Sequence, residues 1–503
     1  MFAFNLAVDS GVMTLEQVLH GVPLRTELSG NLLRIEVTGL EYDSRRVEAG
    51  FLFFAFPGSR ADGREFAQAA IDKGAIAVAS ELPAPAGFRG AWIEVERGRR
   101  ALALAARNFY ERADERLGLT GVTGTNGKTT TTYLIDAVLR AAGKTTALVG
   151  TIEYRLAGEA HAAVNTTPES LDLYRIFHAL EQAGGTHASM EVSSHALALD
   201  RVYGIDFHTA VFTNLTRDHL DFHVDMPAYF AAKRLLFEPE GAPPPPWNVL
   251  NSDDPYGREI HPAGQVVKYG FEEGADLRGS ELESDFEGLR FTVEQDGRKQ
   301  RLRSALVGKI NAYNILAACG AALSYGLDWQ TIAAGIADCR RVPGRFESVD
   351  QGQPFMVAVD YAHTDDALRN VIAIARQLGP KRVITLFGCG GDRDRSKRPL
   401  MGMAAGEASD FVVLTSDNPR SEDPLAIIND ALVGLRRFDT PHIVEPDRAK
   451  AIRAALKEAK PGDIVILAGK GHEPYQVFKD RVIHFDDREV TGEVLQSMGF
   501  GRG

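Results

Sequence analysis

The chain alternates short apolar runs with longer stretches in which apolar residues recur every three or four positions. Short runs of this kind are typical of buried strands, and the longer spacing is typical of amphipathic helices. The clearest runs are FLFFAF, TALVG, ASMEV, HTAVFT, VITLF and DIVILA, and each gives way to polar residues or glycine. Repeated strand–helix alternation predicts an α/β protein with parallel sheets, whose ligands lie at the carboxyl ends of the strands.

Length and pattern together predict three domains, because 503 residues are too many for a single hydrophobic core. The predicted domains are residues 1–114, 115–341 and 342–503. From residue 274 to 306 the pattern changes to short alternating strands, with Asp296-Gly297 as a hairpin turn. The basic, proline-containing segment 340–345 is interpreted as a hinge before the third domain.

Composition narrows the class of protein. Apolar residues make up 44% and charged residues 25%, which is typical of a soluble globular protein. The net charge of −12 argues against a nucleic-acid surface. Cys319, Cys339 and Cys389 lie far apart, so neither a disulfide framework nor a zinc site is indicated. The first residues lack a basic signal-peptide region, and no apolar run reaches the roughly 20 residues that span a bilayer. A cytoplasmic protein without membrane insertion is expected.

The stretch Leu119–Thr130, L-T-G-V-T-G-T-N-G-K-T-T, is the strongest candidate for chemistry. An apolar strand, a glycine-rich turn and a helix start form a cradle for a triphosphate, with Lys128 on the phosphates and a hydroxyl on Mg²⁺. The match to G-x-x-x-x-G-K-[ST] is imperfect, because Val122 stands where the first glycine belongs. The alternative is a glycine-rich turn that only caps a helix.

Two other motifs are excluded by their spacing. The string H-L-D-F-H, which contains His219 and His223, is not H-E-x-x-H, so a zinc protease is not indicated. Gly388-Cys389-Gly390 begins like a dinucleotide fingerprint, but Arg393 stands where the third glycine belongs, so NAD is rejected.

In the first domain, the loops Asp43–Arg46 and Gly58–Gly63 interrupt strands with small, polar and basic residues. They fit a nucleotide diphosphate and equally fit plain surface turns.

Several strings together resemble the Mur ligases, the ATP-dependent amino-acid-adding enzymes of peptidoglycan synthesis. These are T-G-T-N-G-K-T-T, E-V-S-S-H, T-N-L-T-R-D-H-L-D-F-H, G-x-x-N-x-x-N, P-G-R and D-Y-A-H-T, in order along the chain. Within the family, D-S-R-x-V, N-T-T-P, G-G-D-R-D, D-N-P-R and G-K-G-H-E are similar to the member that adds meso-diaminopimelate to UDP-N-acetylmuramoyl-L-alanyl-D-glutamate. The resemblance implies an N-terminal α/β UDP-binding domain, a central P-loop parallel-sheet ATPase domain and a C-terminal Rossmann-like α/β domain.

The resemblance also implies the roles of individual residues on the nucleotide side. The residues implied to bind ATP are Gly124, Thr125, Asn126, Gly127, Lys128, Thr129, Thr130, Asn311, Arg345 and Asp360. The residues implied to hold Mg²⁺ are Thr129, Glu191, His219 and Lys233, the last as a carbamate, and Lys128, Glu191, His219 and Lys233 are the implied catalytic residues. By its periodicity alone, Lys233 in YFAAKRLLF is an ordinary helix lysine.

The implied substrates are small molecules, and a monomer is expected. The implied contacts of the UDP-sugar peptide are Tyr42, Ser44, Ser59, Arg60, Ala61, Thr166, Thr167, Ser193 and Arg201. The implied contacts of the amino acid are Arg393, Asp417, Asn418, Pro419, Arg420, Gly469 and Glu473. This chain has Leu199 where some relatives have glutamine, which puts one peptide contact in doubt.

Two other classes of protein share part of this pattern. A P-loop motor or regulatory switch shares the phosphate loop but has no use for D-N-P-R or for the uridine-side loops. A folylpolyglutamate synthetase shares the ATP machinery and the ligation chemistry, and only the specificity motifs of the first and third domains argue against it.

Overall fold

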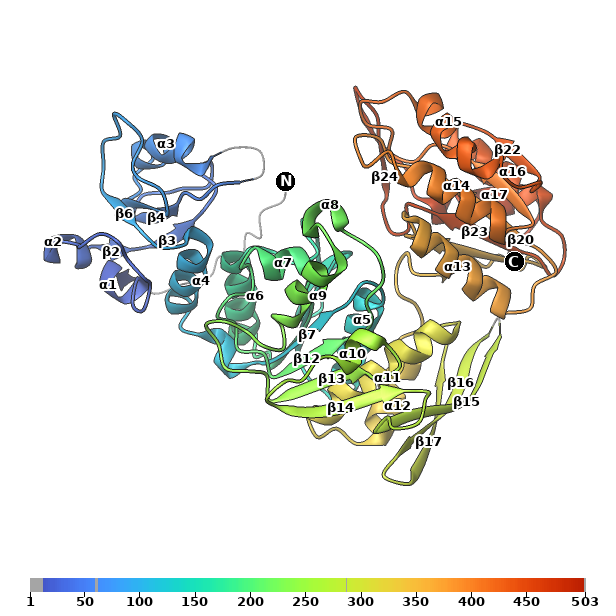
Figure 1. Cartoon of the computed structure of the whole chain (residues 1–503), viewed down its shortest axis with the longest axis horizontal. Coiled ribbons are helices and arrows are strands. Elements are labelled where there is room, and N and C mark those ends of the chain that lie inside the picture. The colour runs from blue at the N-terminus through green and yellow to red at the C-terminus, as the bar shows by residue number, and fades with distance from the viewer. Residues whose placement is uncertain (1–11, 59–61, 286, 502–503) are drawn as a thin grey trace. The chain divides into compact units, whose positions relative to one another are not determined.

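The computed structural model describes residues 12–58, 62–285 and 287–501. It forms two compact units, which are Met1–Arg278 with Leu316–Gly335, and Gly279–Ile315 with Ile336–Gly503. Figure 1 shows strand–helix alternation in both, so the predicted α/β class is confirmed. The boundaries at 114 and 341 stay a prediction. No helix of the described residues is long and apolar enough to cross a membrane.

The first unit begins with a small parallel sheet in the order β3-β4-β5-β6. Its strands are apolar runs because both faces of a parallel sheet are covered. The elements of this part are β1 (Met13–Thr14), α1 (Leu15–Val18), α2 (Gly30–Leu33), β2 (Glu36–Val37), β3 (Gly39–Glu41), β4 (Phe51–Phe54), η1 (Gly63–Phe66), α3 (Ala67–Asp72), β5 (Ala77–Ser80), β6 (Trp92–Glu94), α4 (Gly98–Phe109) and η2 (Ala113–Arg116).

The larger sheet of the first unit has the order β10-β9-β8-β11-β7-β12-β13-β14, and it is parallel from β8 to β14. Its strands are β7 (Gly118–Thr123), β8 (Thr146–Val149), β9 (Glu153–Leu156), β10 (Glu159–Ala162), β11 (His187–Glu191), β12 (Thr209–Phe212), β13 (Trp247–Asn251) and β14 (Gln265–Gly270). Its helices are α5 (Lys128–Ala141), α6 (Ser170–Gln182), α7 (Ser194–Ala198), α8 (Leu220–His223), α9 (Met226–Arg234) and α10 (Pro255–Arg258). Because β7 lies between β11 and β12, the glycine-rich loop leaves from the middle of the sheet, where open α/β sheets bind ligands.

The predicted change of pattern after residue 274 is confirmed. The elements are β15 (Leu277–Asp285), β16 (Gly288–Gln295), β17 (Arg298–Ser304), α11 (Lys309–Ser324) and α12 (Trp329–Asp338). Strands β16 and β17 pair antiparallel, and Asp296 and Gly297 join them with φ values of 49° and 74°. Two successive positive φ values are what a two-residue hairpin turn of type I′ requires, which is why Asp-Gly predicts it.

The last sheet, in the second unit, has the order β18-β19-β23-β20-β21-β22 and is parallel from β19 to β22. Helices α13, α14 and α15 contribute to the apolar core on one face, and α16 and α17 to the core on the other. The elements are β18 (Glu347–Ser348), β19 (Met356–Asp360), α13 (Asp365–Gln377), β20 (Val383–Phe387), α14 (Lys397–Ala408), β21 (Phe411–Leu414), α15 (Pro424–Leu435), β22 (His442–Val444), α16 (Arg448–Glu458), β23 (Ile464–Ala468), β24 (Tyr475–Val477), β25 (Val482–His484) and α17 (Asp487–Ser497).

Candidate active site

The loop that follows β7 is shaped by glycine. Gly124 has a φ of 148°, and a Cβ added there would lie 1.9 Å from Thr213 Oγ1. Gly127 is the N-cap of α5 and has a φ of 88°. Both positions disfavour larger residues, so the backbone can turn tightly from the centre of the sheet into the helix. The positive end of the α5 dipole therefore lies at the carboxyl edge of the sheet, as a phosphate loop requires.

Asn214, which the sequence analysis did not identify, holds this loop in place. Its carbonyl oxygen accepts a hydrogen bond from the N–H of Thr125 at 2.8 Å, and its Oδ1 accepts one from the N–H of Asn126 at 3.0 Å. The hydroxyl of Thr213 donates to the carbonyl oxygen of Asn126 at 2.6 Å. These two loop N–H groups are thus engaged within the protein, which differs from the expectation that the loop N–H groups face phosphates. The sequence signals were the polar pair that follows the apolar strand β12 and its place at the start of the T-N-L-T-R-D-H-L-D-F-H string.

Two lysines converge on one carbonyl oxygen of the loop. Lys128 Nζ donates to the carbonyl oxygens of Gly124 at 2.9 Å and Thr125 at 3.0 Å. Lys233, from α9, donates its Nζ to the same Gly124 oxygen at 2.7 Å and is 1% exposed. Burial and the neighbouring Lys128 charge hold the pKa of Lys233 well below its ordinary value, against the opposing effect of Asp218. A buried amine of this kind is readily neutral.

Two of the implied metal ligands, Glu191 and His219, follow the strands on either side of β7, which are β11 and β12. Glu191 ends β11, and its carboxylate accepts hydrogen bonds from the N–H of Thr151 at 2.8 Å and from the hydroxyl of the same residue at 3.2 Å. His219 has a φ of 53°, and its Nε2 lies 3.4 Å from Asp218 Oδ2. Burial lowers the pKa of His219 to about 4, so its imidazole is neutral at pH 7 and able to donate a lone pair.

A closed protein cage for a cation is not part of this site. Across residues 12–58, 62–285 and 287–501, no group of three or more His, Cys, Asp or Glu side chains is placed to hold a metal ion. A scattered donor set fits Mg²⁺, which keeps several waters and is bound through one or two carboxylates together with substrate phosphates. His223 Nε2, from the H-L-D-F-H string, lies 2.9 Å from Ser194 Oγ.

The residues implied for the muramoyl peptide come together beside Glu191. The hydroxyl of Thr167 donates to the carbonyl oxygen of Glu191 at 2.9 Å and accepts from the N–H of Ser193 at 3.1 Å. Arg201 Nη1 donates to the carbonyl oxygen of Thr167 at 3.0 Å. The hydroxyls of Thr166 and Thr151 are 3.0 Å apart. The loop before α6 and the start of α7 therefore form one polar surface next to the phosphate loop.

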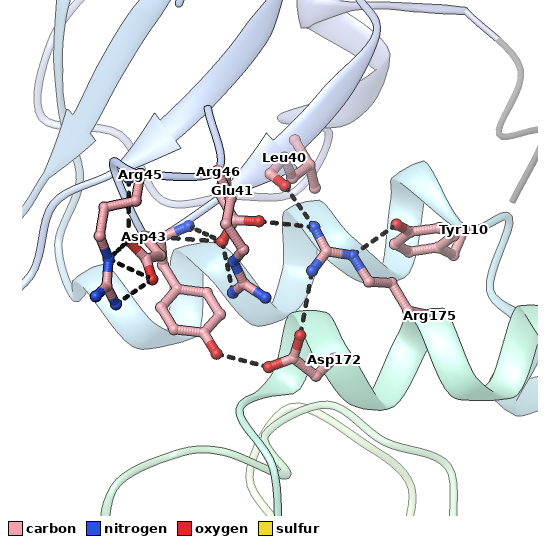
Figure 2. A network of polar contacts seen from close by, with 9 residues as sticks. Leu40, Glu41, Asp43, Arg45, Arg46, Tyr110, Asp172 and Arg175 are labelled. Carbon is pink, nitrogen blue, oxygen red and sulfur yellow. Dashed lines mark hydrogen bonds and ion pairs between the residues drawn. The ribbon is translucent and has the colours of Figure 1, made fainter. Parts of the chain in front are cut away.

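Around Tyr42, which is implied to contact the uridine diphosphate, the structure links the first sheet to α6 (Figure 2). Tyr42 OH donates to Asp172 Oδ2 at 2.6 Å, and the carbonyl oxygen of Ser44 accepts from Lys73 Nζ at 2.9 Å. Burial, with Asp172 adding to it, raises the pKa of Tyr42 far above its ordinary value, so the phenol stays protonated. The implied contacts Ser59, Arg60 and Ala61 lie outside the described residues.

Arg175 is the centre of this network and was not found from the sequence. Its guanidinium donates to Asp172 Oδ1 at 3.1 Å, to Glu41 Oε2 at 3.1 Å and to the carbonyl oxygen of Leu40 at 2.9 Å (Figure 2). Glu41 is 2% exposed at the end of β3. The available signal was an Asp–Arg pair three residues apart on α6, which resembles any surface pair on a helix.

Replacing Arg175 with methionine should lower the free energy of unfolding of the first unit by about 3 kcal/mol, because Glu41 loses one of its buried partners. The matched control is Arg45→Met, which removes the pair of Arg45 with Asp43 on the same network (Figure 2). Arg45 is 67% exposed, so that variant should unfold like the unmodified protein. The measurement is urea denaturation of both variants, and equal losses would contradict the central place of Arg175.

The remaining residues implied for ATP belong to the second unit. Asn311 Nδ2 donates to the carbonyl oxygen of Val307 at 2.8 Å. Asp360 accepts from the N–H of Phe346 at 2.7 Å and from that of Ala362 at 2.8 Å, and burial raises the pKa of its carboxyl. The guanidinium of Arg345 lies 5.3 Å from the ring centre of Tyr361. Arg345 and Asp360 are thus carried by neighbouring segments.

The implied amino-acid site is assembled at the carboxyl edge of the last sheet. Asn418 Nδ2 donates to Glu473 Oε2 at 2.9 Å, and a Cβ at Gly469 would lie 2.6 Å from Asp417 Oδ2. Four of the implied contacts are therefore brought together. Arg393 is exposed in the same loop as Gly391, and a Cβ added at Gly391 would lie 1.9 Å from the carbonyl oxygen of Pro419.

Arg420 follows Pro419 with a φ of 51°, which is strained for a residue with a side chain. Its N–H donates to the carbonyl oxygen of Val477 at 3.0 Å, and its Nη1 donates to the carbonyl oxygen of Gly391 at 2.7 Å. Backbone and guanidinium are both fixed, as the prediction of a stiff turn requires.

Lys470 was missed although it lies inside the G-K-G-H-E string. It is fully buried, and its Nζ is 3.2 Å from Asn418 Oδ1 and 3.4 Å from Glu473 Oε2. The buried ammonium of Lys470 thus forms an ion pair with the Glu473 carboxylate inside the implied amino-acid site.

Comparison with known proteins identifies the family. Three models match along the chain: "Mur ligase family, catalytic domain" at residues 36–110, "Mur ligase middle domain" at 122–322 and "Mur ligase, glutamate ligase domain" at 344–471. These agree with the expected three-domain architecture. The matched segments leave the exact boundaries open.

Relatives match over nearly the whole chain. A protein of Solibacter usitatus named UDP-N-acetylmuramoyl-L-alanyl-D-glutamate--2,6-diaminopimelate ligase is 65% identical, covering 97% of this chain and 99% of that protein. One of the same name from Syntrophomonas wolfei is 46% identical, covering 94% and 97%. A solved structure titled as that ligase is 31% identical with a TM-score of 0.69, covering 97% of this chain and all of the other. The chain therefore belongs to the Mur ligase family.

Proposed function

We propose that this protein joins meso-diaminopimelate to the D-glutamate of UDP-N-acetylmuramoyl-L-alanyl-D-glutamate with hydrolysis of ATP to ADP and phosphate. The observation that carries the proposal is the 65% identity, over 97% of the chain, to a relative named for this ligation. The turn Asp417–Arg420, which holds a fixed guanidinium, supports the choice of amino acid.

The reaction requires activation of a carboxylate, because a carboxylate does not react with an amine by itself. As in the rest of the family, the carboxylate to be joined, here that of D-glutamate, attacks the terminal phosphate of ATP, forms an acyl phosphate and releases ADP. The amine of the second substrate then attacks the acyl carbon, a tetrahedral intermediate forms, and phosphate leaves. The protein has to neutralise phosphate charge and align the two substrates.

The nucleotide is assigned to the loop and to the second unit. We assign the phosphates to Gly124–Thr130 with Lys128 as their cation, and the adenine, phosphate and ribose side to Asn311, Arg345 and Asp360. Thr129, Glu191, His219 and Lys233 as a carbamate would hold Mg²⁺, which supplies charge neutralisation at the phosphates. The hard oxygen donors and the neutral imidazole of His219 support this choice of metal.

The other two substrates are assigned to the two flanking regions. The uridine diphosphate belongs to Tyr42, Ser44 and the loop that contains Ser59, Arg60 and Ala61. The muramoyl peptide belongs to Thr166, Thr167, Ser193 and Arg201, and diaminopimelate to Asp417–Arg420 with Arg393, Gly469 and Glu473. Glu473 suits the ammonium group, and Arg420 suits the far carboxylate.

The proposal is tested by phosphate release from ATP with purified protein. Release is expected only when UDP-muramoyl dipeptide and meso-diaminopimelate are both present, together with a tripeptide product in the mass spectrum. Turnover with a folate and glutamate would favour a folylpolyglutamate synthetase. ATP hydrolysis that neither substrate changes would favour a P-loop motor or switch.

Lys233 is expected to be carbamylated in the active enzyme. Its neutral Nζ can attack CO₂, lose one proton to solvent and become a carbamate anion, which places a negative charge beside Lys128 and creates an oxygen ligand. Protein equilibrated with ¹³CO₂ should show a carbamate carbon signal that is missing in Lys233→Ala. That variant should lose ligase activity by a factor of about 100 or more.

A short-chain carboxylate is expected to restore part of the activity of Lys233→Ala, because it can occupy the place of the carbamate. The control is Arg234→Ala on the same helix, whose side chain pairs with Glu238 at the surface. A bare ammonium at Lys233 in a map of the active, ligand-bound enzyme would contradict the carbamate.

A further inference from the structure

A completely buried ion pair lies beneath the proposed amino-acid site. Arg448 is the first residue of α16, Asp487 is the first residue of α17, and the side chains of both have 0% exposure. Arg448 Nε donates to Asp487 Oδ1 at 2.7 Å, and Nη2 donates to Oδ2 at 2.6 Å. The two bonds are the parallel fork that an arginine makes with a carboxylate.

The other contacts of the guanidinium reach two strand ends. Nη2 also donates to the carbonyl oxygen of Ala468 at 3.0 Å, and Nη1 donates to that of Ser416 at 3.4 Å. Ala468 is the last residue of β23, and Ser416 follows β21. Strand β20 lies between these two strands in the sheet, so Arg448 links strands that do not pair with each other.

The residues that come next in the chain are those assigned to the substrate. Asp417 follows Ser416 and opens the turn that ends at Arg420, and Gly469 follows Ala468 and opens the loop that reaches Glu473. The guanidinium therefore fixes the two backbones at the points where they enter the site.

Stability alone is a weak reason for such a pair. Removing two charges from water costs several kcal/mol per ion, and well-packed apolar residues are often as stabilising as a buried pair. Apolar side chains, however, would not hydrogen-bond two carbonyl oxygens and would not set the distance between two strand ends.

We propose that Arg448, held by Asp487, is a positioning residue for the amino-acid substrate of this ligase. By hydrogen-bonding the carbonyl oxygens of both Ser416 and Ala468, it sets the spacing between the Arg420 turn and the Glu473 loop. Arg420 can then bind the carboxylate, and Glu473 the ammonium group, of the same diaminopimelate molecule. This inference rests on the proposed function.

The first test is Arg448→Lys, which keeps the charge but cannot form the fork and bond both carbonyl oxygens. The KM for meso-diaminopimelate should rise about tenfold or more, since a small misplacement of binding groups is costly. The KM values for ATP and for UDP-muramoyl dipeptide should stay within about twofold, since the hydrogen bonds of Arg448 go to Asp487, Ser416 and Ala468 and to none of the described residues assigned to those substrates. Because the affinity for diaminopimelate is reduced in this variant, its preference for diaminopimelate over lysine should also be reduced.

The matched control is Arg382→Lys at the other edge of the same sheet. Arg382 precedes β20 and pairs with Asp463 and Glu458, each at 2.8 Å, so its replacement also disturbs an arginine–carboxylate pair. It should lower the melting temperature without changing the KM for diaminopimelate. If Arg448→Lys does not fold, the double variant Arg448→Met/Asp487→Leu removes both charges together and should show the same selective rise in KM.

The outcomes separate the two claims. An unmodified enzyme that releases no phosphate with diaminopimelate would refute the proposed function. If the unmodified enzyme does release phosphate with diaminopimelate, but its Arg448 variants keep the original KM and selectivity, the positioning role is overturned. A uniform rise of KM for all three substrates, or an equal rise in Arg382→Lys, would also overturn it, because a merely structural role predicts those results.

Discussion

Replacing Lys128 with alanine should reduce ATP-dependent ligation by a factor of about 1000 or more while the fold is retained. Lys128 is the first residue of α5, so its ammonium adds to the positive end of the helix at the place proposed for the phosphates. Its Nζ is held by the carbonyl oxygens of Gly124 and Thr125, which places it over the loop before any ligand binds. The measurement is ADP release with all three substrates present.

A matched control comes from the other end of the same helix. Lys144 is exposed just after α5 ends, so Lys144→Ala changes the same charge without reaching the loop. That variant should keep the original rate, and circular dichroism should show both variants folded. Ligation at the original rate by a folded Lys128→Ala protein would refute the phosphate-loop assignment.

Much of the fold could be predicted because the signals are local. Strands such as β20 and β23 are fully buried on both faces, so each is a nearly continuous apolar run that gives way to polar residues or glycine. The hairpin at Asp296-Gly297 is encoded by two residues whose positive φ values suit that turn. The carboxyl-edge position of the Asp417–Arg420 turn follows from the strand before it.

The contacts that organise the site could not be predicted in the same way, because they join residues far apart in the chain. Lys128 and Lys233 share the carbonyl oxygen of Gly124, yet nothing around Lys233 distinguishes it from a surface helix lysine. The Arg448–Asp487 pair likewise joins two helix starts. Charged residues of this kind have no periodicity that marks them as buried, and only the tertiary structure reveals the partner.

The structure adds contacts at the implied peptide site and at the phosphate loop that the sequence motifs did not contain. The geometry brings Thr166, Thr167, Ser193 and Arg201 close to Glu191, so the implied peptide site is a connected surface. It also shows that two N–H groups of the phosphate loop are engaged by Asn214, one by its backbone carbonyl oxygen and one by its side-chain Oδ1. The sequence motif alone could not predict which loop N–H groups are used in this way.

The unmodified enzyme should prefer meso-diaminopimelate over lysine by a factor of about 1000 or more in kcat/KM, which corresponds to several kcal/mol. The two amino acids differ by one carboxylate at the far end, and a guanidinium matches a carboxylate with two parallel hydrogen bonds. Arg420 is prepared for this role because its Nη1 is held by the carbonyl oxygen of Gly391 and its backbone by that of Val477. When lysine binds, the guanidinium loses its intended partner.

Arg420→Ala should therefore lose the preference mainly through the KM for meso-diaminopimelate, while kcat/KM for lysine changes little, because lysine never used the guanidinium. The control is Arg369→Ala, which removes an arginine of the same unit that pairs with Glu407 at the surface and should keep the original selectivity. Both variants are measured by phosphate release over a range of each amino acid. Comparable kcat/KM values for lysine and diaminopimelate in the unmodified enzyme would show that this turn does not select the substrate, since a fixed guanidinium cannot bind both amino acids equally well.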